Sequence, residues 1–484
     1  MLFNSVIFIS TFLPLSLLGW YLLQKLENPG FAKAFLIGMS FWFYGYYNIS
    51  YLWILLVSLV FNYCVSALFM RKDGSKALLV AGILGNLGLL FYFKYFNFFI
   101  GNCNYLLHTD IRLEEIALPL GISFFTFQQL SFVIERYKGS APHYSILDYG
   151  FFVSFFPQLI AGPIVLHSEL IPQLQYRDNR RFSTSGFYDG LTLFILGLAK
   201  KVLLADSLAV LVNAEYENIA ALDTPSAWVV ICWYMAELYF DFSGYCDMAR
   251  GIAGMFGFRL PENFDSPFKA VSVRDFWRRW HMTLSRFLSQ YIYFPLGGNR
   301  KGKARQCWNL LIVFLVSGLW HGANWTFILW GLMHGLAAVF ETMFPKLRFP
   351  REWMNRLVTF IFVTLTFSVF RSDSLEQAGQ LWQKLFLAGN KRMLSPICNV
   401  LWYPENYAAI KFLQLSAPGA LNLFFVFCML FLSVLCIVLI RGSKAQQWIA
   451  KYGGTPTGIF ILATLFTWSF LSLSQVSVFL YFNF

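Results

Sequence analysis

The sequence predicts an all-α, polytopic membrane protein, and three observations lead to that prediction. The chain has 484 residues, of which 57% are hydrophobic and only 13% are charged, about half the charged share of a typical soluble protein. Apolar runs long enough to cross roughly 30 Å of hydrocarbon recur along the whole chain. These runs lack the alternation of barrel strands, and a helix satisfies every backbone polar group inside the bilayer.

About twelve of these runs are expected to cross the membrane, judged by length. The first is expected to be a retained span, because no Lys or Arg precedes Lys25 and no small-residue cleavage site follows the run. The candidate spans are residues 3–23, 31–46, 51–70, 77–99, 119–134, 184–204, 226–246, 306–320, 325–343, 355–370, 421–440 and 457–475.

The spans are expected to form one membrane domain over residues 1–484, since no stretch is left for a second, soluble domain. Within it we distinguish N-terminal helices in 1–140, a polar-rich core in 148–345 and C-terminal helices in 346–484.

Loop charge predicts the orientation of the spans. Basic loops at 71–76 and 136–138 alternate with an acidic loop at 110–115. By the positive-inside rule, this alternation places the N-terminus outside the cell. The loop 371–419 is a mild conflict, because it should lie outside and yet carries several basic residues.

The stretch 148–166 interrupts the series of spans. It contains Pro157, Gly162 and Pro163, which break helical hydrogen bonding. A re-entrant segment here keeps the later basic loops cytoplasmic. Non-helical backbone at membrane depth is tolerated only where protein or a cavity covers it, so this stretch is a candidate cavity wall.

The net charge of +12 is unevenly distributed. Nine basic residues stand between Lys269 and Arg305 against one acid, Asp275. Nucleic-acid binding is a poor explanation, because the cluster lies between membrane spans. The cluster is either a cytoplasmic loop that follows the positive-inside rule or a site for an anionic ligand, and some residues can serve both purposes.

Polar side chains also occur where an inert membrane helix would have none. In AELYFDFSGYCDMARG (236–251), Glu237 and Asp241 are four residues apart and share a helix face. They are either functional groups or part of an ion-pair network between helices. In VRDFWRRWHMTLSRFL (273–288), Arg274, Arg278 and His281 have the spacing i, i+4, i+7, which predicts one stripe of an interfacial helix.

The stretch SGLWHGANWTFILWGLMHG (317–335) places His321 and His334 among aromatic and aliphatic residues. His334 taken alone is typical of a hydrogen-bonded core group. His321 stands where an apolar run ends beside glycine, so its ring can reach a cavity and accept a proton near neutral pH. The chain lacks GxSxG and HExxH, so neither a serine nucleophile nor a metal is expected. Histidine chemistry then favours transfer of an activated group to a hydroxyl.

Seven motifs in this order resemble the membrane-bound O-acyltransferase superfamily, most closely its bacterial alginate and peptidoglycan O-acetyltransferases. They are LPLGISFFTFQQLSF (118–132), FFPQLIAGPI (155–164), ELYFDFSGYCDMA (237–249), FRLPENFDSPF (258–268), FWRRWHMTLSRFL (276–288), SGLWHGANWTFILWGLMHG (317–335) and FLYFNF (479–484). The resemblance implies a ring of roughly 11–12 transmembrane helices around a central funnel or tunnel, with re-entrant and interfacial helices.

The resemblance also implies a site. His321 of the WHG motif is expected to be catalytic, as general base, and His281 to lie across the same tunnel. The phosphates of an acetyl-CoA donor are expected to contact Arg278, Arg279 and Lys301. The residues expected to line the tunnel are Trp320, Asn324, His334, Glu237, Asp241 and Gln158.

The implied activity is transfer of acetyl from cytoplasmic acetyl-CoA toward hydroxyls of an exported alginate- or peptidoglycan-type polysaccharide. It implies a bacterial plasma (inner) membrane location, no metal, and an exported esterase-like partner that passes acetyl to the polymer. One alternative is D-alanyl transfer from a carrier protein to teichoic acid. Another is a transporter of small anionic or lipid-linked solutes, although no inverted repeat is evident.

Overall fold

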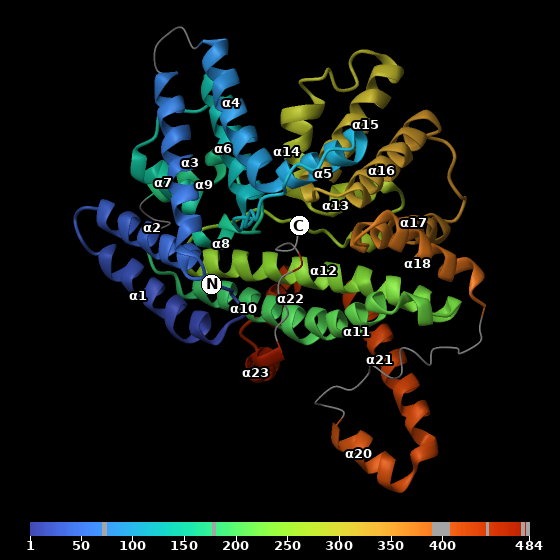
Figure 1. Ribbon diagram of the computed structural model, residues 1–484. Coiled ribbons are helices and arrows are strands. Elements are labelled where there is room, and N and C mark those ends of the chain that lie inside the picture. The colour runs from blue at the N-terminus through green and yellow to red at the C-terminus, as the bar shows by residue number, and fades with distance from the viewer. Residues whose placement is uncertain (70–74, 177–180, 390–406, 442–444, 476–479, 481–484) are drawn as a thin grey trace.

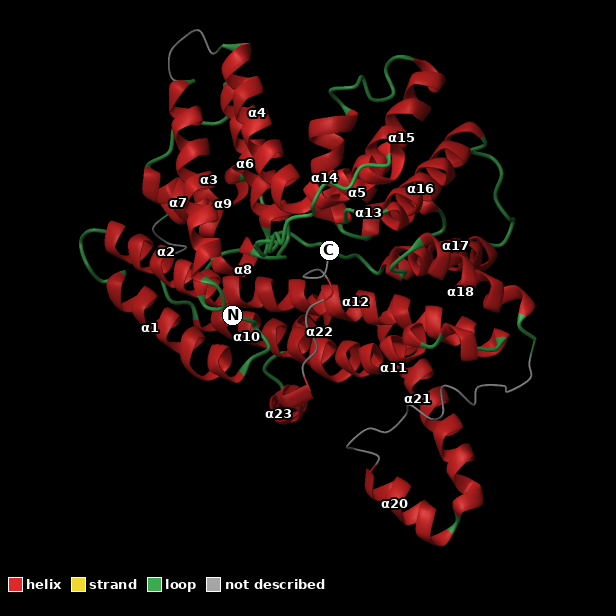
Figure 2. Ribbon diagram, viewed as in Figure 1, coloured by secondary structure: helices red, strands yellow, loops and turns green. Residues whose placement is uncertain are grey.

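The computed structural model describes residues 1–69, 75–176, 181–389, 407–441, 445–475 and 480. Within these ranges the regular elements are all helices (Figures 1 and 2), which confirms the predicted all-α class. Most of the basic loop 71–76 and residues 481–484 of the terminal FLYFNF motif lie outside the described residues.

Five helical segments in the described ranges are long and apolar enough to cross a membrane by length and composition. Together with the composition they support the polytopic membrane class. They are Ile49–Leu68, Lys76–Leu107, Trp325–Met343, Glu352–Arg371 and Leu423–Ile440, and Phe8–Leu23 and Pro456–Leu471 are shorter apolar helices.

The N-terminal region is a set of packed helices, and its first helical segment begins later than residue 3. The Met1 amino group donates to the Phe43 carbonyl at 2.9 Å, and Phe3 stacks on Phe43, so the first residues pack against α2. The elements are η1 (Phe8–Phe12), α1 (Leu13–Leu23), α2 (Gly30–Gly45), α3 (Ile49–Leu68), α4 (Lys76–Leu90), η2 (Phe91–Tyr95), α5 (Phe96–Leu107) and α6 (Ile122–Tyr137).

The stretch expected to be re-entrant forms short, broken helices: α7 (Ile146–Ser154), α8 (Phe156–Leu159) and α9 (His167–Gln175). Nine residues of helix rise only about 14 Å, so α7 is too short to cross a bilayer. The helix breaks at Phe155, and residues 148–167 are all buried. The interrupted backbone is therefore covered by protein, as such backbone must be at membrane depth.

Two long helical segments cross the middle of the molecule side by side (Figure 1). The first comprises α10 (Thr184–Ala199), η4 (Lys200–Ala205) and α11 (Asp206–Glu217); the second is α12 (Thr224–Met255). Glycines let the two backbones meet. A Cβ at Gly190 would lie 2.7 Å from the Gly251 carbonyl oxygen, and one at Gly197 would lie 2.6 Å from that of Gly244. Small residues at helix contacts are typical of membrane proteins.

The next region holds the histidine motifs. Its elements are α13 (Val273–Arg279), α14 (Met282–Leu288), η7 (Ser289–Tyr293), α15 (Gly302–His321), α16 (Trp325–Met343), α17 (Glu352–Arg371) and α18 (Leu375–Leu387). A Cβ at Gly318 of α15 would lie 2.3 Å from the Phe327 carbonyl oxygen, and one at Gly331 of α16 would lie 2.4 Å from that of Phe314. The α15–α16 hairpin therefore packs backbone against backbone.

Two predictions about this half of the chain are wrong. Arg274, Arg278 and His281 do not lie on one helix, because α13 ends at Arg279 and His281 has a φ of 45°. The stretch 371–419 is not simply a loop, because it contains α18 and α20 (Tyr407–Ser416). The C-terminal helices are α21 (Leu421–Arg441), α22 (Ala445–Tyr452) and α23 (Pro456–Leu471), followed by η10 (Ser472–Gln475).

Candidate active site

His321 is the last residue of α15, and its ring is held in one orientation. Nδ1 lies 2.6 Å from the Ser317 carbonyl oxygen, one helical turn earlier. A carbonyl oxygen only accepts, so in the neutral ring Nδ1 carries the proton and Nε2 carries the lone pair. The next residue is Gly322, and a side chain would not fit there, because a Cβ would lie 2.0 Å from the Phe327 ring. The helix end thus presents an imidazole with a defined basic nitrogen.

His281 lies in the turn between α13 and α14, where its backbone is in the left-handed region. Its ring is fully buried and packs edge-on against the Phe242 ring, with 4.8 Å between the ring centroids. The centroids of the His281 and His321 rings are 6.4 Å apart. The structure therefore brings together two histidines that are 40 residues apart in the sequence.

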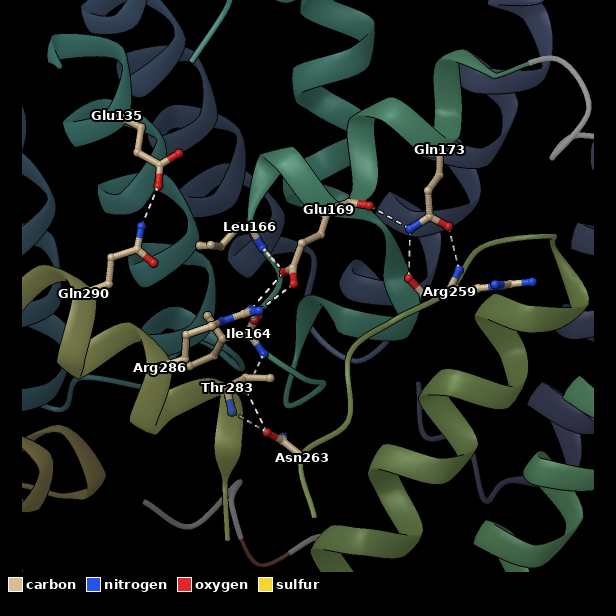
Figure 3. A network of polar contacts seen from close by, with 10 residues as sticks. All are labelled: Glu135, Ile164, Leu166, Glu169, Gln173, Arg259, Asn263, Thr283, Arg286 and Gln290. Atoms are coloured by element: carbon tan, nitrogen blue, oxygen red, sulfur yellow. Dashed lines mark hydrogen bonds and ion pairs between the residues drawn. The ribbon is translucent and has the colours of Figure 1, made fainter. Parts of the chain in front are cut away.

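Polar contacts fix the segment around His281 against the stretch 155–166 (Figure 3). The Ile164 amide donates to Thr283 Oγ1 at 3.0 Å, and that hydroxyl donates to Asn263 Oδ1 at 2.7 Å. Arg286 donates to both carboxylate oxygens of Glu169, at 2.5 and 2.9 Å. Arg286, one member of the basic cluster, is therefore a structural group that clamps α14 to α9.

Two separate volumes lie near His321. A small pocket of about 30 Å³ is lined by His321, Trp320 and Ile160, and this volume suits about one water molecule. A larger cavity of about 890 Å³ lies beside it. Lys94 and Leu118 line both volumes, so the two adjoin at these residues.

Glu237 lines the larger cavity and is 1% exposed. Among the described residues, neither of its carboxylate oxygens has a hydrogen-bond partner. Asp241, one turn along α12, instead lies 2.6 Å from Lys201, which also donates to Asp206 at 2.7 Å. The sequence allowed Glu237 and Asp241 to be either functional groups or members of an ion-pair network. In the structure their roles differ, because Asp241 belongs to an ion-pair network and Glu237 faces the cavity.

His334 lies fully buried in α16, away from both volumes near His321. Its Nδ1 accepts from Trp277 Nε1 at 3.1 Å, and its Nε2 lies 2.9 Å from Thr366 Oγ1. Both ring nitrogens are engaged in these contacts. His334 was expected on the tunnel wall. It instead lies in the protein interior, where its contacts join α13, α16 and α17.

The other expected lining residues are divided between the volumes and the protein interior. Trp320 borders the small pocket and Asn324 the larger cavity. Asn324 also begins α16, where its side chain accepts from the Thr326 amide. Gln158 is buried and donates to the Phe152 carbonyl, so Ile160 is the residue of this stretch that reaches the pocket.

The three basic residues expected to hold phosphates line neither volume near His321. Arg279 pairs with Asp275 at 3.0 Å. Arg278 and Lys301 are exposed. Lys301 ends a tight turn with positive φ at Gly297 (108°) and Gly298 (57°), a conformation that glycine adopts without strain.

Sequence reasoning missed Lys94. The residue lies in the π-helical segment η2 and reaches the end of α15, where its Nζ donates to the Trp320 and His321 carbonyls. The available signal was a lone lysine within the apolar run 77–99.

The chain is similar in sequence to known membrane-bound acyltransferases. Residues 41–371 match the model of the membrane-bound O-acyltransferase family, MBOAT. A peptidoglycan O-acetyltransferase of Helicobacter pylori is 41% identical over 414 residues, 78% of each chain. The “Probable alginate O-acetylase” of Pseudomonas aeruginosa is 36% identical over 80% of this chain and 75% of its own. A teichoic acid D-alanyltransferase of Bacillus subtilis is 26% identical over 51% of this chain and 65% of its own.

Proposed function

The chain belongs to the membrane-bound O-acyltransferase family and is an O-acyltransferase, and from that premise we propose that it transfers acetyl from cytoplasmic acetyl-CoA toward an exported polysaccharide. The observation that carries the proposal is the His321 imidazole, whose Nδ1–H···O=C contact leaves Nε2 as the basic nitrogen. Relatives named for peptidoglycan and alginate O-acetylation support acetyl as the group and polysaccharide as the final acceptor.

The proposed reaction is a direct acyl transfer. The acceptor hydroxyl oxygen attacks the thioester carbonyl carbon while His321 Nε2 takes the hydroxyl proton. A C–O bond forms, the C–S bond breaks, and the proton passes from the imidazolium to the departing thiolate. Over the whole reaction the His321 ring gains neither charge nor proton, so it returns to its starting state. His281, 6.4 Å away, is proposed to orient or polarise the thioester carbonyl.

The two volumes suggest how the substrates approach. We assign the larger cavity to the acceptor, since Asp373 in its lining belongs to the stretch 371–419, which is expected outside the cell. The donor phosphates are assigned to the predicted cytoplasmic side, at the exposed Arg278 and Lys301, with Arg279 held beside them by Asp275. The small size of the pocket at His321 favours the acyl transfer, because it limits the water that could hydrolyse the donor.

The setting of the reaction follows from the same assignment. We place the protein in the bacterial plasma membrane with its N-terminus outside, in line with the loop charges. Because the reaction centre lies inside the protein, a polymer chain cannot reach it whole. An exported esterase-like partner that accepts acetyl and passes it to the polymer solves this problem.

The deciding experiment gives ¹⁴C-acetyl-CoA to inside-out membrane vesicles that carry the protein, so that the donor reaches the cytoplasmic face, and measures label in the acceptor fraction. His321→Ala should abolish transfer at unchanged membrane abundance, while His143→Ala, which alters an exposed histidine, should transfer at the wild-type rate. Normal transfer by His321→Ala refutes the proposed base. Label transferred only from a D-alanyl carrier protein, and none from acetyl-CoA, supports the teichoic acid alternative instead.

A further inference from the structure

Lys94 makes a set of contacts at the end of the helix that carries His321. Its Nζ donates to the Trp320 carbonyl at 2.6 Å, to the His321 carbonyl at 3.0 Å and to Ser123 Oγ at 3.3 Å. In the described part of the chain Lys94 has no carboxylate partner. The ammonium is therefore held by two backbone carbonyls and one hydroxyl rather than by an ion pair.

The last turn of a helix leaves four carbonyls without intrahelical donors. In α15 these belong to residues 318–321. The Gly322 amide donates to the Gly318 carbonyl at 3.4 Å, and the Tyr95 hydroxyl donates to the Leu319 carbonyl at 2.7 Å. Lys94 serves the remaining two, which belong to Trp320 and His321 themselves. The segment η2 thus supplies most of the C-terminal cap of α15.

Lys94 lies in a local distortion of its helix. Residues 91–95 form a π-helical segment between α4 and α5, and such segments are often found at functional sites because they redirect side chains. The negative end of the α15 dipole favours a cation at this point. A lysine in a membrane segment is costly nonetheless, and such residues are usually functional.

We propose that Lys94 is a positioning residue for acyl transfer. By binding the carbonyls of residues 320 and 321, it fixes the end of α15 and so holds the His321 ring opposite His281. The inference rests on the proposed role of His321 as the base. It also gives η2 a role, because this segment carries both Lys94 and Tyr95, which donate to the last carbonyls of α15.

The test measures kcat and donor KM with purified protein in nanodiscs. Lys94→Met keeps the length of the side chain but removes its charge and donors, and it should lower kcat about 100-fold with donor KM nearly unchanged, since small misplacements of a catalytic group have effects of this size. Lys94→Arg, which retains charge and donors, should recover much of the loss. Tyr95→Phe is the matched control, because it removes a neutral hydrogen bond from the same helix end and should cost less than about fivefold.

A second readout does not depend on turnover. Diethylpyrocarbonate modifies neutral imidazole, and peptide mass spectrometry gives the rate at His321. The rate of His321 modification should differ from the wild-type rate in Lys94→Met and equal it in Tyr95→Phe. The inference is overturned if Lys94→Met keeps wild-type kcat and wild-type His321 reactivity, or if Tyr95→Phe loses as much kcat.

The two proposals can fail separately. Full activity in His321→Ala would reject the proposed base, whereas the reactivity comparison would still decide whether Lys94 positions the ring. If Lys94→Met does not accumulate in the membrane, Lys94→Gln takes its place, because an amide keeps two donors without the charge. Wild-type kcat in Lys94→Gln then overturns the requirement for the ammonium.

Discussion

The imidazole rings of His281 and His321 lie 6.4 Å apart, centroid to centroid, and are inclined at 79°. They come from different elements, since His321 ends α15 and His281 occupies the turn between α13 and α14. The two rings are therefore positioned independently. Each can be removed while the elements that hold the other remain in place.

His281→Asn should reduce kcat by about 100-fold and leave residual transfer, as expected when one group that assists the base is lost. Asparagine is the suitable replacement, because it tolerates the left-handed backbone at this position better than most residues. The measurement is acetyl transfer from labelled acetyl-CoA by the purified protein. Wild-type donor turnover in this variant would show that His281 has no part in the reaction.

Glu237→Gln should raise the KM for the acceptor by about tenfold with little effect on donor KM. Its carboxyl oxygens line the larger cavity without hydrogen-bond partners in the described residues, so they are available to a hydroxyl of the acceptor, and one such hydrogen bond is worth about 0.5–1.5 kcal/mol. Initial rates at varied acceptor concentration give the answer.

Asp241→Asn is the matched control for Glu237→Gln. Asp241 pairs with Lys201 inside the protein, and breaking a buried pair by removing one partner costs about 3–5 kcal/mol. This variant should therefore lower the melting temperature, with acceptor KM unchanged in the protein that remains folded. A KM effect equal to that of Glu237→Gln would assign both acids to the cavity.

His334→Leu should destabilise the protein by about 1–3 kcal/mol, because it leaves the buried Trp277 indole N–H without an acceptor and removes one of the two hydrogen bonds of the Thr366 hydroxyl. His334→Gln, which can both donate and accept, should lose less. Thermal unfolding in detergent measures both. If His334→Leu instead keeps its melting temperature and loses transfer, His334 has a direct role in the reaction.

Gly331→Ala should strongly reduce the amount of folded protein, because the added Cβ would lie 2.4 Å from the Phe314 carbonyl oxygen. Gly379→Ala in α18 is the control, since nothing lies within 4 Å of a Cβ there. That change should stabilise the helix by about 0.4–1 kcal/mol. Size-exclusion profiles of the two proteins measure the difference, and equal profiles would contradict the close packing of α15 and α16.

Glu215, which lies between the candidate spans 184–204 and 226–246, should make the stability of the protein depend on pH. Burial raises the pKa of its carboxyl to about 6 from an ordinary value of 4.5. The folded protein therefore holds this proton more tightly than the unfolded chain, and stability falls as pH rises from about 4.5 through 6. Glu215→Gln should melt higher than wild type at pH 8 and equally at pH 4. An equal difference at both pH values would exclude this cause.

Much of the helical framework could be predicted from the apolar runs. The run 325–343 coincides with α16, and 421–440 lies within one residue of α21. The stretch 371–419 was harder, because α18 is amphipathic and buries only one face, at Ala378, Leu381 and Leu385. Hydropathy over a membrane-length window does not detect such a helix.

The site was predicted in part. The motifs indicated that His281 and His321 matter, but helical spacing placed His281 on a continuous helix, and a left-handed residue leaves no mark in apolar periodicity. Lys94 contacts residues more than 220 positions away in the chain, so its role depends on tertiary structure. The difference between Glu237 and Asp241 likewise depends on Lys201, which comes from another helix.

The glycine contact between α15 and α16 has a consequence for motion during turnover. Gly318 lies one turn before His321, and the backbones there are too close for either helix to slide past the other without losing contact. The base is thus carried by a rigid hairpin. Any rearrangement that admits substrates is therefore expected in groups outside this hairpin, such as Leu118, which lines both volumes near His321.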